Sequence, residues 1–123
     1  MTKSKNWWVV FKNAFQGVIY AFQTQRNFKI HLFLSFLVVF LAIWLDISKT
    51  EFLFLTLAII FGLTVEMANT AFEKTVDLVI EKYHPQAKIA KDVSAGMMLI
   101  ASFGLALMGL LILLPPLWQK LGF

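Results

Sequence analysis

Residues 93–119 read VSAGMMLIASFGLALMGLLILLPPLWQ and contain no acidic or basic side chain. A helix needs about 20 consecutive, mostly apolar residues to cross the hydrocarbon core of a bilayer. Hydrophobic residues make up 59% of the 123-residue chain and charged residues only 15%, whereas soluble domains average about 25% charged residues. One small core cannot bury so many apolar side chains. The stretch therefore predicts a helix in lipid.

Two further apolar stretches precede it, and together they predict an all-α membrane protein with three transmembrane helices. The spans are expected over about 28–47, over about 52–72 with the helix continuing to about 81, and over about 93–117. A break is expected at His84-Pro85, and the third span should end at Pro115-Pro116. The whole chain, residues 1–123, is expected to form one domain.

The N-terminal segment, about residues 3–24, predicts an amphipathic helix. Its polar positions share one narrow face at helical spacing: Lys5, Lys12, Gln16 and Gln23. Such a helix can lie in the plane of the membrane surface, and the alternative is a helix packed on the bundle. Aromatic anchors at the interface are expected at Trp7, Trp8, Trp44 and Trp118. Close helix packing is expected at Gly96, Gly104 and Gly109.

The basic residues predict the orientation in the membrane. Nine of them precede the first span or lie between the second and third: Lys3, Lys5, Lys12, Arg26, Lys29, Lys74, Lys82, Lys88 and Lys91. Only Lys49 and Lys120 lie on the other side. By the positive-inside rule, the N-terminus and residues 74–91 should be cytoplasmic. The net charge of +4 suits anionic lipid head groups, and no nucleic-acid partner is expected.

Four polar residues near the end of the second span form the candidate site. Glu66, Asn69, Glu73 and Asp77 are spaced i, i+3, i+7 and i+11, which places them within a stripe of roughly 80° on a helix. Placing a charged side chain within a membrane span costs about 3 kcal/mol of free energy. The position of Glu66 in a span therefore predicts that this residue has a functional role. Glu73 and Asp77 alone would be typical of a solvated helix surface.

The chemistry of this stripe favours a hard cation. Oxygen ligands suit Mg²⁺, which commonly bridges carboxylates and substrate phosphates. Lys91 and Asp92, near the start of the third span, could add a phosphate-binding charge and a further carboxylate. The chain has no cysteine, hence no thiolate metal site. It also has neither GxxxxGK[ST] nor GxGxxG, so a soluble type of nucleotide fold is excluded.

The segment Glu66 to Asp77 reads EMANTAFEKTVD and resembles the signature of the small prokaryotic diacylglycerol kinase family, which includes undecaprenol kinases. Two more blocks resemble the family, AKDVSAG at residues 90–96 and RNFKIH at residues 26–31. The resemblance covers almost the whole chain. It implies a homotrimer in the bacterial inner membrane, with sites shared between subunits, that phosphorylates a lipid alcohol at the cytoplasmic face using ATP and Mg²⁺.

The resemblance also implies roles for single residues. Glu66 matches the catalytic base and Glu73 a metal-binding glutamate, while the nucleotide and phosphate site is matched by Asn69, Asp77, Lys91 and Asp92. The family's second metal-binding glutamate falls at Gln25, a neutral side chain. His31 is expected to be an ordinary polar residue of the membrane interface.

Three functions remain open from the residues themselves: a lipid kinase, a non-catalytic nucleotide- or lipid-binding membrane protein of the same fold, and a small cation transporter or channel. Gln25 favours the second, and the uncharged third span argues against the third. Undecaprenol and diacylglycerol both present one hydroxyl above apolar tails. The segment from Glu81 to Asp92 looks more like the Gram-positive and cyanobacterial branch, which favours undecaprenol.

Overall fold

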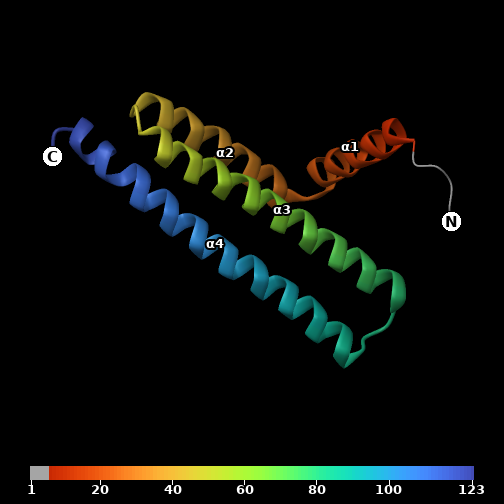
Figure 1. The fold of residues 1–123 in the computed structure, drawn as a ribbon. Helices are drawn as coiled ribbons and strands as arrows, with labels where there is room; N and C mark the ends of the chain where they lie inside the picture. Colours follow the sequence, from red (N-terminus) through yellow and green to blue (C-terminus); the bar gives the residue numbers. More distant parts are fainter. Residues whose placement is uncertain (1–5) are drawn as a thin grey trace.

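The computed structural model describes residues 6–123, which form four helices and, within that range, no strand (Figure 1). The helices are α1 (Trp7–Thr24), α2 (Arg26–Trp44), α3 (Lys49–Val79) and α4 (Pro85–Lys120). Helices α2, α3 and α4 are each long and apolar enough to cross a membrane, so the predicted all-α fold with three candidate spans is confirmed. Lys3 and Lys5, assigned above to the N-terminal helix, lie outside the described residues.

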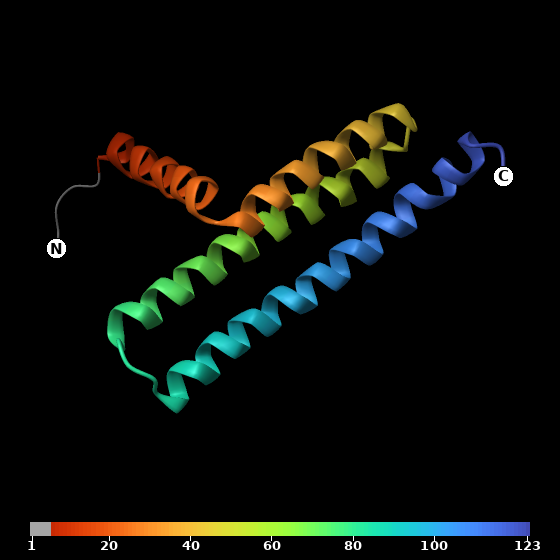
Figure 2. The same cartoon turned by 180° about the vertical axis from the view of Figure 1, so that it is seen from behind.

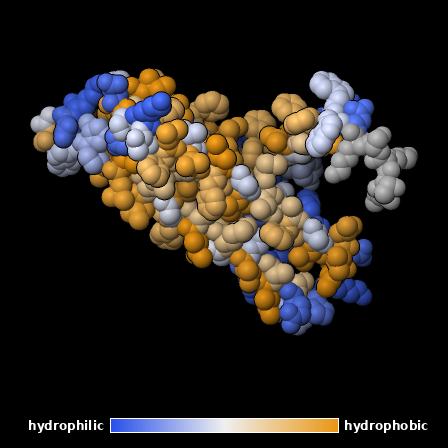
Figure 3. Space-filling model, in the orientation of Figure 1, coloured by the Kyte–Doolittle hydropathy of each residue, from blue (hydrophilic) through white to orange (hydrophobic). Residues whose placement is uncertain are grey.

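The three long helices lie side by side, and α1 stands apart from them (Figures 1 and 2). Helices α2 and α3 form an antiparallel hairpin, while α4 runs back along α3 in the most extensive pairing of the fold. The link between α3 and α4 lies at one end of the bundle, and the C-terminus lies near the α2–α3 turn at the other. Hydrophilic residues gather at these two ends, with apolar surface between them (Figure 3), as a membrane-crossing bundle requires.

Helix α3 begins earlier than the predicted start near residue 52. Ser48 accepts a hydrogen bond from the backbone N–H of Glu51 at 3.2 Å, and the Glu51 carboxylate accepts one from the Ser48 backbone N–H at 3.3 Å. This capping box satisfies backbone donors that a helix start would otherwise leave unpaired. The helix therefore begins at Lys49, and it ends at Val79 rather than at about 81.

Helix α2 ends at Trp44, so the prediction that the first span continues to residue 47 is wrong. The chain turns at Asp46, whose φ of 51° lies in the left-handed region. Aspartate adopts this conformation more readily than most residues because its short side chain can bond locally to the backbone. The turn brings the Ile47 N–H to the Ala42 carbonyl oxygen at 3.3 Å.

Helix α4 is longer at both ends than the predicted span of 93–117. Pro85 occupies its first turn, where no N–H is needed, and His84 Nδ1 accepts from the Gln86 N–H at 3.1 Å. The polar residues 86–92 are therefore helical. Pro115 and Pro116 do not end the helix, which continues to Lys120. Membrane helices tolerate proline where local adjustments satisfy the freed carbonyl groups.

A small apolar cluster closes the bundle at the end with the α2–α3 turn. Ala42, Leu45, Leu55 and Leu113 are buried together there. Beside them, Lys120 Nζ donates to the Trp44 carbonyl oxygen at 3.0 Å and lies 4.6 Å from the centroid of its ring. These contacts tie the end of α4 to the end of α2.

Side chains of α2 and α4 pack tightly against Gly62 of α3, which the sequence analysis did not single out. A β-carbon there would lie 2.1 Å from His31 Cε1 and 2.6 Å from Leu105 Cδ1. The absence of a side chain at Gly62 makes room for both. The glycines predicted to permit close packing have no such neighbour within 4 Å in this chain: Gly96, Gly104 and Gly109.

Candidate active site

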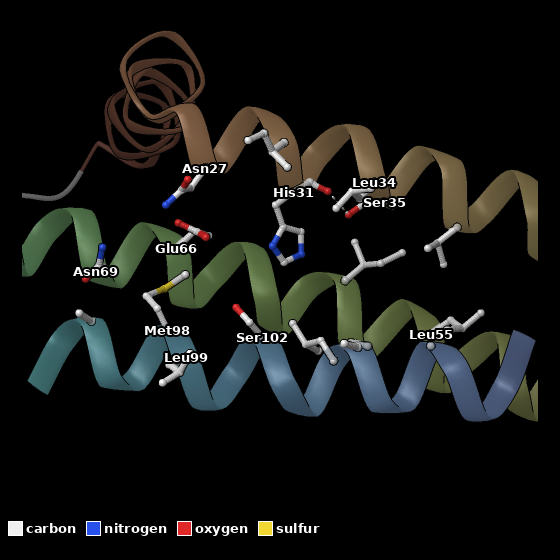
Figure 4. Close-up of a pocket in the computed structure, with 18 of the residues that line it drawn as sticks. Asn27, His31, Leu34, Ser35, Leu55, Glu66, Asn69, Met98, Leu99 and Ser102 are labelled. Atoms are coloured by element: carbon white, nitrogen blue, oxygen red, sulfur yellow. Dashed lines mark hydrogen bonds between the residues drawn. The ribbon is translucent and has the colours of Figure 1, made fainter. Parts of the chain in front are cut away.

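A cavity of about 730 Å³ lies between α2, α3 and α4 (Figure 4). Most of its lining is apolar and comes from all three helices, including Leu34 and Leu55 as well as Met98 and Leu99 of α4. Its polar lining residues are Asn27, His31, Ser35, Glu66, Asn69, Glu73 and Ser102. A mostly apolar cavity with a few converging polar groups is the usual form of a small-molecule site.

Glu66 is the buried acidic residue of this cavity. Only 8% of the residue is exposed, and its carboxylate lies among the labelled side chains between α2 and α4 (Figure 4). Facing the cavity keeps the carboxylate out of the lipid, where a charge would be expensive.

Asn69 and Glu73 continue the polar wall along α3. Asn69 Nδ2 donates to Glu73 Oε1 at 3.3 Å, and both residues line the cavity with Glu66. One turn of helix separates each from the next, as the spacing predicted. The three residues therefore present two carboxylates and one amide to the same space.

Asp77 and Lys91 form an ion pair beyond the cavity. Lys91 Nζ lies 2.5 Å from Asp77 Oδ1, and both side chains are about half exposed. Asp92 instead pairs with Lys88 on its own helix, also at 2.5 Å. Neither Asp77, Lys91 nor Asp92 lines the cavity. The structure thus joins Lys91 to the α3 stripe through Asp77, while Asp92 makes no such contact.

Gln25 lies at the junction of α1 and α2, outside the cavity lining. Its Nε2 donates to Thr24 Oγ1 at 3.3 Å. The structure therefore does not bring Gln25 to Glu73 in the cavity, although the family resemblance pairs them as metal ligands. Asn27, one half-turn further along α2, does line it.

Two carboxylates on one cavity wall could contribute ligands to a hard cation. Among residues 6–123, no group of three or more His, Cys, Asp or Glu side chains is placed to hold a metal. Mg²⁺ typically uses only one or two carboxylates and fills its octahedron with water and substrate phosphates. Glu73 and Glu66, on one cavity wall, offer hard oxygen donors of this kind.

A second polar stripe in the cavity was missed by the sequence analysis. Asn27, His31 and Ser35 all line the cavity from α2, and their spacing of four residues places them on one helix face. Ser35 Oγ donates to the His31 carbonyl oxygen at 2.8 Å. The His31 ring packs against Gly62, so it faces the neighbouring helices, and the prediction of an ordinary polar residue of the membrane interface stays a prediction. The four-residue spacing within an apolar span was the signal available for finding this stripe.

A family model described as prokaryotic diacylglycerol kinase matches residues 12–113. The chain belongs to the prokaryotic diacylglycerol kinase family. This membership confirms the resemblance drawn from residues 66–77. The family description and the names of its relatives indicate a lipid kinase.

Three relatives within the family show how far the similarity extends. A diacylglycerol kinase of Synechocystis sp. is 43% identical over 89% of this chain, but the match spans only 63% of that protein's length. The undecaprenol kinase of Bacillus subtilis is 36% identical, and the match covers 87% of each chain. A diacylglycerol kinase of Pseudomonas aeruginosa is 32% identical over 69% of each chain.

Proposed function

We propose that this protein transfers a phosphoryl group from ATP to the hydroxyl of a membrane lipid alcohol, with Mg²⁺, at the cytoplasmic face of the bacterial inner membrane. One observation carries the proposal. The buried carboxylate of Glu66 shares a cavity with Asn69 and Glu73, and the rest of that cavity is mostly apolar. Such a space suits a molecule with one polar end and a hydrocarbon tail. The four helices together form the proposed kinase domain.

In the proposed reaction, Glu66 accepts the proton of the lipid hydroxyl as that oxygen attacks the γ-phosphorus of ATP. The bond between this phosphorus and the bridging oxygen breaks, and ADP leaves. A general base of this kind must lie within hydrogen-bond reach of the hydroxyl. Phosphoryl transfer otherwise depends on positioning and on neutralising phosphate charge, and Mg²⁺ would supply that neutralising charge when bound. Glu73 would hold the cation together with water and phosphate oxygens. Asn69 adds an amide group to the same wall of the cavity.

Residues beyond the cavity are proposed to receive the nucleotide. Lys91 brings a positive charge to the stripe through its pair with Asp77. Both side chains are about half exposed, so a phosphate group could compete for the lysine. Asp92 and Gln25 are assigned to the nucleotide and metal site by family likeness alone, and Gln25 as a metal ligand is the weakest of these assignments because it lies outside the cavity lining.

The membrane arrangement is proposed from charge and surface character. The N-terminus and residues 74–91 would face the cytoplasm, because the basic residues gather there. Helix α1 would lie on that membrane surface, with exposed Trp7, Trp8 and Phe11 in the lipid boundary. A homotrimer is proposed from family likeness, and the exposed apolar side chains of Phe61 and Ile100 offer packing surface for neighbouring subunits.

The acceptor is proposed to be undecaprenol, with diacylglycerol as the alternative. The stretch from Glu81 to Asp92 favours the first, and relatives bearing each name are similar to this chain. Purified protein should be assayed with both lipids side by side, using labelled ATP. Faster phosphorylation of diacylglycerol at equal lipid fraction would reverse the assignment.

Replacement of Glu66 by glutamine tests the proposed base. The variant keeps the size and polarity of the side chain but cannot accept the proton, so kcat should fall about 10²- to 10⁴-fold while the protein remains folded. Glu81→Gln, at an exposed glutamate in the α3–α4 link, is the matched control and should keep normal turnover. Undiminished turnover in E66Q would refute the role of Glu66.

A non-catalytic nucleotide- or lipid-binding protein of the same fold is the second candidate. It is favoured by Gln25, which replaces a charged ligand of the family pattern with a neutral one. A Mg²⁺ titration of the wild-type protein with both lipid alcohols separates the two functions. Absence of phosphate transfer at every Mg²⁺ concentration would support binding alone.

A further inference from the structure

Ser94 makes an unusual hydrogen bond for a serine within a helix. Serine and threonine hydroxyls in helices commonly donate to the carbonyl four residues earlier, as Ser35, Thr56 and Thr70 do here. Ser94 Oγ instead crosses from α4 to α3 and donates to Asn69 Oδ1 at 2.6 Å. The residue is buried, with 5% of its surface exposed. Its hydroxyl therefore serves a contact between helices.

This bond fixes which way the Asn69 amide points. An amide side chain has one accepting oxygen and one donating NH₂ group. Because Oδ1 accepts from Ser94, the NH₂ group is left to face Glu73, where Nδ2 lies 3.3 Å from Oε1. The hydrogen bonds run in one direction, from Ser94 to Asn69 to Glu73.

We infer that Ser94 is a positioning residue for the site on α3: it holds the Asn69 amide so that Glu73 is oriented to receive the cation of a metal–nucleotide substrate. This inference rests on the proposed function, and it adds a residue that does not itself line the cavity. One Glu73 oxygen takes the Asn69 donor, which leaves the other free for the cation. A carboxylate held at one oxygen loses less freedom when the second binds.

A purely structural role for Ser94 has different consequences. Polar side chains between membrane helices also contribute to helix association. If Ser94 only joins α3 to α4, its loss should lower stability and disturb the Asn69 amide but leave cation affinity unchanged. The two roles are therefore separable by measuring cation binding together with stability.

The test uses Ser94→Ala, which removes the hydroxyl, and Ser94→Thr, which keeps it. Thr56→Ala is the matched control, because the Thr56 hydroxyl bonds only within α3 and lies outside the cavity lining. Affinity for Mn²⁺ with a non-hydrolysable ATP analogue is measured on full-length protein in micelles by electron paramagnetic resonance. S94A should weaken this affinity about three- to tenfold, the equivalent of one hydrogen bond. S94T and T56A should bind like wild type.

A second readout follows the amide without any metal. The chain has four asparagines, so selective ¹⁵N-asparagine labelling gives few side-chain NH₂ signals, and Asn69→Asp assigns the one of interest. S94A should move or double this signal, and T56A should not. If S94A does not fold, Ser94→Cys serves instead, because it nearly keeps the side-chain volume and has a weaker hydrogen-bond donor. It should show smaller changes in affinity and in the Asn69 signal.

The outcomes separate this inference from the proposed kinase function. Wild-type affinity in S94A, whatever the Asn69 signal, in a protein that phosphorylates lipid, would overturn the role of Ser94 and leave the kinase in place. A wild-type protein that transfers no phosphate, yet binds Mn²⁺–nucleotide more weakly after S94A, would overturn the kinase and support the positioning role. Loss of stability alone would assign Ser94 to helix packing and overturn the inference.

Discussion

Replacing Gly62 by alanine tests the packing that shapes the cavity. The added β-carbon would lie 2.1 Å from His31 Cε1, 2.5 Å from His31 Nε2 and 2.6 Å from Leu105 Cδ1. These neighbours belong to α2 and α4, so both helices must shift or two side chains must change conformation. Overpacking of this kind costs about 1–3 kcal/mol, and the helix preference of alanine over glycine offsets about 0.5–1 kcal/mol. We expect a net loss of about 1–2 kcal/mol in the free energy of unfolding.

The loss is measured by detergent-induced unfolding in mixed micelles, followed by circular dichroism. Gly104→Ala is the matched control, since a β-carbon at Gly104 would have no neighbour within 4 Å in this chain. With no clash to oppose it, the helix preference of alanine should raise the stability of this control by about 0.5–1 kcal/mol. The double variant His31→Ala, Gly62→Ala removes two of the three close contacts. It should therefore be less destabilised than the sum of its single variants.

Phosphate transfer by the Gly62→Ala variant provides the second measurement. His31 and Leu105 both line the cavity, so their displacement should lower the rate with lipid as well as the stability. If this variant is as stable as Gly104→Ala and turns over lipid at the wild-type rate, His31 does not pack against Gly62 as described. The reasoning about the cavity would then be refuted.

Two further substitutions test the residues outside the cavity. Lys91→Met should lower the affinity for ATP at least tenfold, yet cost less than about 1 kcal/mol of stability because the pair with Asp77 is half exposed. Lys82→Met, in the α3–α4 link, is the control. Equal KM values for ATP in the two variants would contradict the role of Lys91. Gln25→Glu restores a carboxylate and should lower the Mg²⁺ concentration needed for half-maximal activity several-fold. An unchanged Mg²⁺ titration would place Gln25 outside the metal site.

The helices and the α3 stripe were predictable because both depend on local spacing. Uninterrupted apolar runs indicated the three long helices, and the period of the α-helix placed Glu66, Asn69 and Glu73 on one face. The helix limits were less predictable, because they depend on capping. Ser48 with Glu51 begins α3 earlier than its apolar run suggests, and His84 with Pro85 does the same for α4.

The contacts between helices could not be read from the sequence. Gly62 differs from the other glycines only because His31 and Leu105 converge on it in space. In the same way, a serine at position 94 could have bonded to its own helix, as Ser35 does. Its partner Asn69 is 25 residues away, and only the packing of α3 against α4 brings the two together.

The unequal lengths of the helices have a consequence for the surrounding bilayer. Helix α3 has 31 residues and α2 only 19, which correspond to about 46 Å and about 28 Å at 1.5 Å per residue. Only the shorter length matches a hydrocarbon core of roughly 30 Å. Measured from Lys49, Glu66 stands about 26 Å along α3, close to where such a core would end, and Asp77 stands well beyond it. In the proposed reaction, bilayer thickness would therefore set the depth at which the lipid hydroxyl meets Glu66.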